Sequence, residues 1–300
     1  NGLPFSAALA LQCFVNEYVF VESDEEIAAV EKIQQRIAKL LNEKRDVPPH
    51  IVATLGAYRP LHGFPWAREL RERAWSGEIK EVIKRQMLEP LEEAALRDQI
   101  PHLTKLQDTV SKAVREQYEE YPYPRWFKAG LSKNGTAIGS VLGSSSLRFD
   151  LGDYQTPENP DVLVAGCGTG QHALGTASRY LNAQVLAVDL SLSSLSYALR
   201  KTQELGLSNI EYAQADIMEL GGVGRQFDLI ECVGVLHHLG DPLAGWGVLV
   251  DLLRPGGLMK IGLYSEVARQ HVVAGRSLIC LLYTSPSPRD ATLSRMPSSA

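Results

Sequence analysis

Apolar residues recur three or four positions apart through much of the first 120 residues, which is the spacing of one face of an amphipathic helix. Such runs predict helices over residues 27–41, 79–91 and 103–119. Ser23 and Glu26 form a capping-box pattern before the first run. Ser76 is a candidate N-cap for the second run, and the Pro48-Pro49 pair is expected to end the first helix. We therefore expect residues 1–120 to be an all-α region whose helices pack on one another.

From residue 161 onward, short apolar strands alternate with helical stretches. Strands are expected over Asp161–Ala165, Val185–Asp189, Asn209–Gln214, Phe227–Cys232 and Leu258–Leu263. Helices are expected between them, over about 171–181, 191–205 and 243–252. This alternation predicts an α/β fold, a Rossmann-like, doubly wound parallel sheet. Right-handed crossovers bring the carboxyl ends of all the strands to one edge, where open sheets bind ligands.

An aromatic and proline-rich segment with a Gly/Ser-rich stretch, residues 121–157, separates these two regions. Its prolines interrupt helix formation, and its aromatic residues are dense for a linker. One hypothesis is that Tyr121, Tyr123 and Trp126 fold over a ligand pocket, and packing between domains is an equal alternative. The second domain is expected to span residues 158–279.

The C-terminal segment, residues 280–300, differs in character from the rest of the chain. Cys280–Asp290 reads CLLYTSPSPRD and resembles the translation of a common transposase-based sequencing adapter. Arg295–Ala300, RMPSSA, matches the end of the same adapter at the expected spacing. We interpret residues 280–300 as adapter-derived and disordered, with a natural Ser/Pro-rich tail as the alternative.

Composition and charge narrow the class of protein. The 300 residues are 45% hydrophobic and 22% charged, as in globular domains, and the formal net charge is −5. That weak acidity argues against a dedicated nucleic-acid surface, although it leaves room for a local patch. No apolar run reaches the roughly 18 residues of a membrane span. The cysteines before residue 280 have no paired spacing, which favours a reducing cytoplasm.

The first predicted strand runs into a glycine-rich turn, Gly166-Cys167-Gly168-Thr169-Gly170. Glycine permits positive φ angles and a close approach of the backbone to a ligand, and the following helix points its free N–H groups toward the same place. Such a turn alone is a weak signal, because any tight strand-to-helix connection can contain glycines.

Two acidic residues at strand ends strengthen that signal. Asp189, followed by Leu190, ends the second strand 23 residues after Gly166, where a carboxylate can accept the ribose hydroxyls of a nucleoside. A helix cap is the alternative for Asp189, although Ser191 already suits that role. Asp216 and Ile217 follow the third strand and can meet the amine and a ring nitrogen of adenine, an exposed turn aspartate being the alternative.

Taken as an ordered set, these features resemble the class I S-adenosylmethionine-dependent methyltransferases. The set also includes the FDLI stretch from Phe227, the VLHHL stretch from Val235 and the LLRPGG turn from Leu252, and it covers roughly residues 158–265. The family often carries an acidic residue two positions before the first glycine, where this chain has Val164.

The resemblance implies S-adenosyl-L-methionine as the cofactor and in-line methyl transfer as the reaction. It implies that Gly166, Cys167, Gly168 and Gly170 surround the methionine end, that Asp189 and Leu190 meet the ribose, and that Asp216 and Ile217 meet the adenine. Cys232 and Val233, at the end of the fourth strand, are expected to line the same pocket.

The resemblance extends to the organisation of the chain. Sheets of this family usually continue for two more strands. A natural sequence that stops near Ile279 therefore implies a sheet truncated after the fifth strand. Val15–Phe20 and the QYEEYPYPRW stretch resemble bacterial methyltransferase-domain proteins with helical, often tetratricopeptide, N-terminal regions. Such a region is a candidate surface for a protein partner.

His237 and His238 are the candidates for a catalytic base toward a bound acceptor, and ordinary loop or cap histidines are the alternative. Adjacent helical residues point about 100° apart and neither histidine has a partner four residues away, so no metal site is expected. Cys167 has no identifiable base beside it, which argues against a nucleophilic role.

Two other functional classes remain open from the sequence. An NAD(P)-dependent oxidoreductase would carry glycine at position 171, where this chain has Gln171. A non-catalytic cofactor-binding or interaction module would share the pocket without the reaction. The methyl acceptor, whether small molecule or protein, is not identified by any residue pattern, because acceptor pockets are built from variable loops.

Overall fold

The structure is a computed structural model. It describes residues 2–105, 115, 118–119, 122, 124–143, 155–265 and 267–282, without the side chains of 276 and 278–282. The chain packs as two compact units. The first comprises Asn1–Leu96 with Pro124–Phe127, and the second comprises Arg97–Tyr123 with Lys128–Ala300. Each unit is described by itself below.

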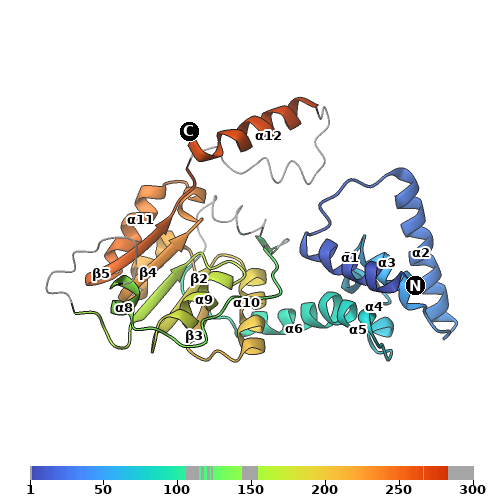
Figure 1. Ribbon diagram of the computed structural model, residues 1–300, viewed down its shortest axis with the longest axis horizontal. Coiled ribbons are helices and arrows are strands. Elements are labelled where there is room, and N and C mark those ends of the chain that lie inside the picture. Colours follow the sequence, from blue (N-terminus) through green and yellow to red (C-terminus); the bar gives the residue numbers. More distant parts are fainter. Residues whose placement is uncertain are drawn as a thin grey trace. The chain divides into compact units, whose positions relative to one another are not determined.

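The first unit is helical (Figure 1). Its α-helices are α1 (Leu3–Val15), α2 (Asp24–Asn42), α3 (Pro49–Gly56), α4 (Ala67–Arg71), α5 (Glu78–Ile83) and α6 (Glu89–Leu96). A 3₁₀ turn, η1 (Leu61–Gly63), follows α3, and a π-helical turn, η2 (Lys84–Leu88), joins α5 to α6. Their apolar faces share one core, so the all-α character expected of this region is observed for these residues.

The helix caps agree with the sequence in one case and differ in two. The capping box is confirmed, since the Ser23 side chain accepts from the Glu26 backbone and the Glu26 carboxylate accepts from the Ser23 N–H. Ser76 is not the N-cap of α5, which begins after Gly77. The Pro48-Pro49 pair does not end α2. Instead, Pro49 is the first residue of α3, where its fixed φ angle and missing N–H suit a helix start.

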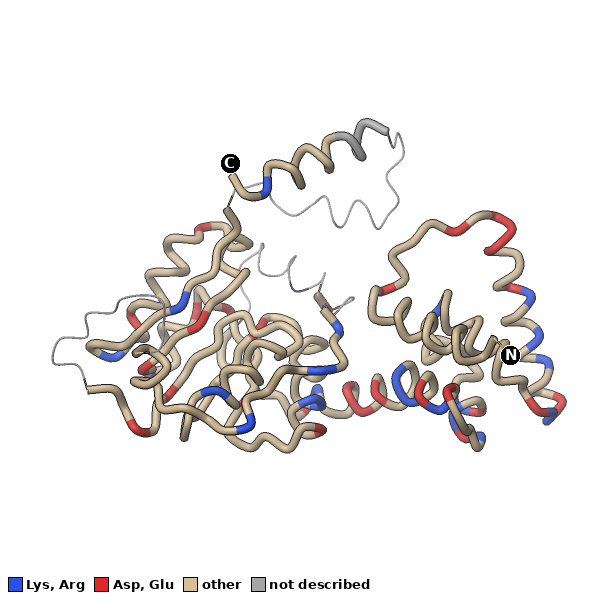
Figure 2. Tube along the Cα trace, in the orientation of Figure 1, with Lys and Arg blue, Asp and Glu red and all other residues tan. Residues whose placement is uncertain are grey.

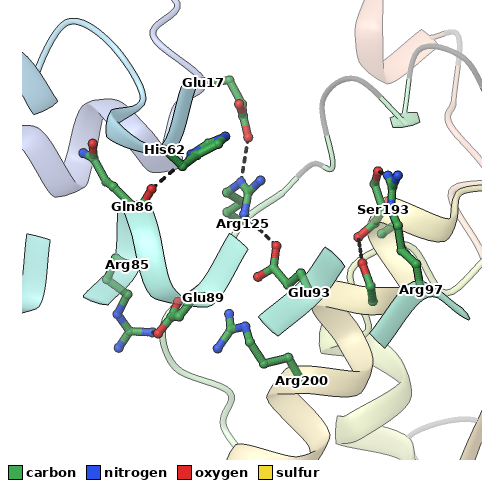
Figure 3. Close-up of polar contacts among 12 residues, drawn as sticks. Glu17, His62, Arg85, Gln86, Glu89, Glu93, Arg97, Arg125, Ser193 and Arg200 are labelled. Carbon is green, nitrogen blue, oxygen red and sulfur yellow. Dashed lines mark hydrogen bonds and ion pairs between the residues drawn. The ribbon is translucent and has the colours of Figure 1, made fainter. Parts of the chain in front are cut away.

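Buried polar groups tie the helical unit together (Figure 3). Gln86, fully buried in η2, donates to the carbonyls of Ala10 at 2.9 Å and Gly56 at 2.8 Å. Arg125 lies between Glu17 at 2.9 Å and Glu93 at 3.5 Å, and its guanidinium covers the Phe14 ring. These ion pairs explain why Pro124–Phe127 packs with helices that are distant in sequence.

The second unit contains a sheet of five parallel strands in the order β3-β2-β1-β4-β5 (Figure 1). The strands are β1 (Asp161–Ala165), β2 (Gln184–Asp189), β3 (Ile210–Gln214), β4 (Phe227–Val233) and β5 (Leu253–Gly262). The helices of this unit are α8 (Ile138–Gly143), α9 (Gln171–Arg179), α10 (Leu192–Leu205), α11 (Pro242–Asp251) and α12 (Gln270–Leu282). The described residues of this unit also include the 3₁₀ segments η3 (Arg97–Gln99), η4 (Ile217–Val223), η5 (Leu236–His238) and η6 (Val267–Arg269).

Helices cover both faces of the sheet. Residues of α8, α9 and α10 pack with Val162 and Val164 on one face, and η4 and α11 pack with Leu163 and Ala165 on the other. Neighbouring strand positions alternate between the two cores, as the pleat requires. The expected Rossmann-like, doubly wound fold is therefore confirmed.

The strand and helix bounds follow the expectations closely except at β5. That strand begins at Leu253, five residues earlier than expected, because the residues predicted as a turn pair with β4 through an irregularity near Phe227. Gly256 takes a φ of +79° there. The Arg254 side chain joins β5 to β4 and β1, since it donates to the carboxylates of Asp228 at 2.5 Å and Asp161 at 2.6 Å.

Residues 97–104 belong to the sheet unit, although the sequence suggested a boundary near 120. Leu103 donates to the carbonyl of Gln214 at 2.9 Å, and the Gln214 N–H donates to Pro101 at 2.8 Å. This pairing extends the end of β3 and accounts for the division at residue 97. Most of the helix expected over 103–119 lies outside the described residues.

The C-terminal helix α12 runs to Leu282 and thus includes the first three residues of the segment expected to be disordered. The remainder of that segment, 283–300, lies outside the described residues. Among the residues that the structure describes, no helix has the length and apolar content that a membrane crossing requires.

Candidate functional site

The glycine turn is bonded to the end of the neighbouring strand. The N–H groups of Gly166 and Cys167 both donate to the carbonyl of Val188, at 2.8 and 2.9 Å. Gly166, Gly168 and Gly170 take φ angles of +73°, +52° and +84°, a region that favours glycine. These bonds fix the turn at the carboxyl edge of β1 and β2.

The three glycines have different surroundings. A Cβ on Gly166 would lie 2.3 Å from a methyl of Val235, and one on Gly170 would lie 2.5 Å from the Cβ of Ala198. A Cβ on Gly168 would meet nothing within 4 Å. Gly166 and Gly170 therefore allow close packing, whereas the backbone at Gly168 borders open space that a ligand can approach.

Asp189 lies directly beside this turn. One carboxylate oxygen accepts from the Gly168 N–H at 2.7 Å, and the other accepts from the Ser191 N–H at 3.0 Å. Burial raises the pKa of Asp189, and the hydrogen bonds from the Ser191 and Gly168 N–H groups oppose that rise. The helix-cap alternative is settled by Ser191, whose own side chain caps α10 through Ser194 N–H at 3.0 Å.

Asp216 lies at the same edge, one strand further along. The Ala215 N–H donates to the Asp189 carbonyl at 3.0 Å, which joins the ends of β2 and β3. Asp216 is 1% exposed, and its Oδ1 accepts from Met218 N–H at 3.0 Å. Its Oδ2 is buried without a hydrogen-bond partner among the described residues. Such an acceptor is costly unless a ligand donor reaches it.

The remaining predicted pocket residues lie at this edge in different ways. The Leu190 carbonyl accepts from the Gln214 side chain at 2.7 Å, and Ile217, the residue after Asp216, is buried.

The Cys232 side chain is fully buried in the core shared with α11, and burial raises the pKa of its thiol to about 12. Val233 is 41% exposed. Burial and the charge of Asp189 also raise the pKa of Cys167, so its thiol stays protonated.

Three residues that the sequence did not single out complete this edge. The Thr104 hydroxyl is 2.8 Å from the Asp216 backbone nitrogen and accepts its N–H. Glu119, just before the aromatic segment, accepts from the Leu192 N–H at 2.6 Å and so caps α10. The third residue is His102, whose Nδ1 forms a hydrogen bond with the side-chain oxygen of Gln214. No local pattern marks these residues, because their partners lie some 70 to 110 positions away.

His237 and His238 lie after β4 on η5. The His237 ring packs 4.3 Å from the Tyr264 ring, centroid to centroid, and Arg269 covers the same tyrosine at 4.1 Å. Neither ring nitrogen of His237 has a hydrogen-bond partner among the described residues. Burial, with the charges of His238 and Arg269, lowers the pKa of His237 to about 4. The ring is therefore neutral at neutral pH, with a free lone pair, and is a weaker base than an ordinary imidazole.

The aromatic segment is described only in part. Trp126 is 6% exposed and packs with the helical unit, while Tyr121 and Tyr123 lie outside the described residues. The hypothesis that these aromatic residues enclose a ligand stays a prediction.

The fold and this edge match a known family. Residues 162–257 match the family model described as "Methyltransferase domain". Over these residues, the chain is similar to methyltransferase domains. This match favours S-adenosyl-L-methionine over a nicotinamide dinucleotide as the cofactor. Within this domain, the glycine turn, Asp189 and Asp216 are brought to one edge, as the sequence predicted.

The methyltransferase domain has relatives of several kinds. An uncharacterised protein of Synechococcus sp. is 31% identical over 190 residues, 62% of this chain and 45% of that protein. A ubiquinone biosynthesis O-methyltransferase of Parvibaculum lavamentivorans is 28% identical over 141 residues, 47% of this chain and 55% of that enzyme. An S-adenosylmethionine-dependent methyltransferase structure from Clostridium acetobutylicum shares 30% identity at a TM-score of 0.31, covering 34% of this chain and 41% of that one. The chain spans about half the length of the curated relatives that it matches.

Proposed function

We propose that the protein transfers a methyl group from S-adenosyl-L-methionine to an acceptor by in-line displacement. The observation that carries the proposal is the pairing of Asp189 with Gly168 at 2.7 Å beside open space. When bound, the cofactor supplies a methyl group on a positively charged sulfur, which is already a good leaving group. The protein's task is then mainly to hold the acceptor, methyl and sulfur in line.

The residues at the sheet edge suit this cofactor. The Asp189 carboxylate lies beside the glycine turn, and we assign its two oxygens to the ribose hydroxyls. The buried Oδ2 of Asp216 is an acceptor for the adenine amine, with Ile217 next to it. Gly166, Cys167, Gly168 and Gly170 are assigned to the methionine end. Leu190, Cys232 and Val233 are assigned to the walls of the pocket.

We assign His237 as the base when the acceptor is a hydroxyl group. The ring is neutral at neutral pH and follows β4 directly, at the same edge as the turn. Val235, which precedes η5, lies beside Gly166, and this proximity to the glycine turn supports the assignment. His238 is the second candidate, and its pKa is also lowered, mainly by burial. An acceptor that is already a carboxylate or thiolate needs no base.

The acceptor class is tested first among oxygen nucleophiles, because a relative is named as an O-methyltransferase of ubiquinone biosynthesis. The assay supplies S-adenosylmethionine with a labelled methyl group to the protein together with phenols, carboxylic acids or protein fractions. Label transfer that disappears in Asp189→Ala supports the proposal. Tight cofactor binding with no transfer to any fraction contradicts a catalytic role and leaves a binding module.

We further propose that the reaction takes place in the cytoplasm and that the helical unit contacts a protein partner. The first proposal is supported by the free thiols of Cys13, Cys167 and Cys232 among the described residues. The second is supported by the size of the helical unit and by exposed apolar residues such as Phe5 and Val21 on it. Size-exclusion chromatography of complexes purified from cells tests the second.

A further inference from the structure

Glu231 is a fully buried carboxylate that none of the assignments above uses. It lies on β4, and its register partners are Val164 on β1 and Lys260 on β5. Register partners in a parallel sheet point to the same face, here the face covered by α9. Val164 is two residues before Gly166, so Glu231 lies just below the glycine turn.

Two residues of α9, and the tyrosine that follows the helix, lie near this carboxylate. His172 Nε2 is 2.8 Å from Glu231 Oε2, and the Thr176 hydroxyl donates to the same oxygen. Tyr180 follows four residues later, and its pKa is raised by burial and then by the charge of Glu231. His172 and Thr176 are four residues apart, so their side chains lie in one row along α9. On the other side, Lys260 Nζ lies 3.7 Å from Oε1.

These neighbours keep Glu231 ionised. Burial alone would raise its pKa, but the hydrogen bonds from His172 and Thr176 and the charges of His172 and Lys260 lower it to about 2. A buried ion pair adds little to stability over apolar residues of similar volume. The arrangement therefore suggests a role in the site rather than a gain in folding free energy.

The contact places His172 at the glycine turn. His172 is the second residue of α9, two positions after Gly170, and its side chain is 30% exposed. Glu231 engages only Nε2, so the ring is held with its other edge directed away from the carboxylate. The free N–H groups of the first turn of α9 lie beside it, at the end of the helix that favours an anion.

We propose that His172, oriented by Glu231, hydrogen-bonds the amino-acid end of S-adenosylmethionine. His172 is the contact residue and Glu231 is a positioning residue that acts through it. The inference rests on the proposed function, because it concerns the same cofactor. It assigns the end of the cofactor that Asp189 and Asp216 do not reach.

The test compares three ligands by isothermal titration calorimetry. S-adenosylmethionine and S-adenosylhomocysteine carry the amino-acid end, whereas 5′-methylthioadenosine has the same nucleoside and sulfur without it. In His172→Ala, we expect the affinity for the first two to fall about 10-fold or more, as for the loss of a charged hydrogen bond. Binding of 5′-methylthioadenosine should stay within about twofold of the wild-type value on the same scale. Glu231→Gln should show the same selectivity with a smaller loss.

Asp228→Asn is the matched control. Asp228 is a second buried carboxylate on β4, but it pairs with Arg254 at the opposite end of the strand, so all three affinities should be unchanged. If His172→Ala weakens all three ligands equally, His172 only supports the pocket and the inference is wrong. Unchanged binding of all three also overturns it. Wild-type protein that binds none of the ligands would instead remove the proposed function itself.

Discussion

Gly168 and Gly170 have the same backbone requirement but opposite surroundings. Both take positive φ angles, yet only Gly170 has a neighbour, Ala198, where a Cβ would lie. We expect Gly168→Ala to destabilise the sheet unit by about 1 kcal/mol, from backbone conformation alone. Gly170→Ala should cost about 2–5 kcal/mol, because steric overlap adds to the same strain. Hydrogen exchange of the β1 and β2 amides measures both.

The loss of affinity for S-adenosylmethionine should follow the reverse order, with Gly168→Ala affected more than Gly170→Ala. A methyl at Gly168 projects into the open space assigned to the ligand, so we expect Gly168→Ala to lower the affinity for S-adenosylmethionine more than its stability cost explains. If Gly168→Ala binds the cofactor as the wild type does, the ligand does not approach that face of the turn.

His237 provides a prediction about pH. Its pKa is lowered to about 4, so we expect its ring protons, followed by NMR, to titrate near pH 4 instead of near 6.5. Because the folded state disfavours the charged ring, the contribution of His237 to folding is complete above about pH 6.5 and is lost as the pH falls toward 4. A titration midpoint near 6.5 would show that the ring is exposed and would contradict the burial of His237 described here.

For single residues, the sequence predicted the positions that follow from the local pattern. Asp189 is the last residue of β2, and Gly166 and Asp216 follow β1 and β3 within two residues, so topology alone brings these positions to one edge. Thr104 and Glu119 could not be predicted, because they reach the edge from segments with no recognisable pattern. Glu231 was read only as part of a strand, since nothing in the sequence shows which helix will cover it.

Among the elements, α2 shows how a cap fixes a helix start. The Ser23 side chain and the Glu26 carboxylate satisfy each other's backbone N–H groups. We expect Ser23→Ala to lower the unfolding free energy of the helical unit by about 1 kcal/mol, measured by urea denaturation. Ser76→Ala is the matched control, since Ser76 is exposed and α5 is capped at Gly77, and it should change stability by less than about 0.5 kcal/mol. Equal losses in both variants would contradict the capping account.

The elements that departed from expectation did so for identifiable reasons. Proline is compatible with both the end and the first turn of a helix, so the Pro48-Pro49 pair alone could not decide between them. The LLRPGG stretch reads as a turn, but pairing with β4 across an irregular register makes it part of β5. In both cases tertiary packing, which a local pattern does not contain, chose between two allowed structures.

For the whole molecule, alternating strands and helices were enough to predict the parallel sheet and the edge at which the glycine turn, Asp189 and Asp216 lie. The division between the units was not predictable in the same way, because it depends on Arg125 and on residues 97–104 packing with distant partners. Acidic and basic residues are interspersed along the described chain (Figure 2). The net charge of −5 is therefore not concentrated in one long stretch of either unit.

The central claim is that the turn at 166–170 and the Asp189 carboxylate together hold the nucleoside of S-adenosylmethionine. The most direct measurement is calorimetric titration of the chain with 5′-methylthioadenosine, for the wild type, Asp189→Asn and the exposed-site control Asp251→Asn. The account predicts one saturable site that Asp251→Asn retains and Asp189→Asn weakens about 10-fold or more. Wild-type affinity in folded Asp189→Asn would contradict it.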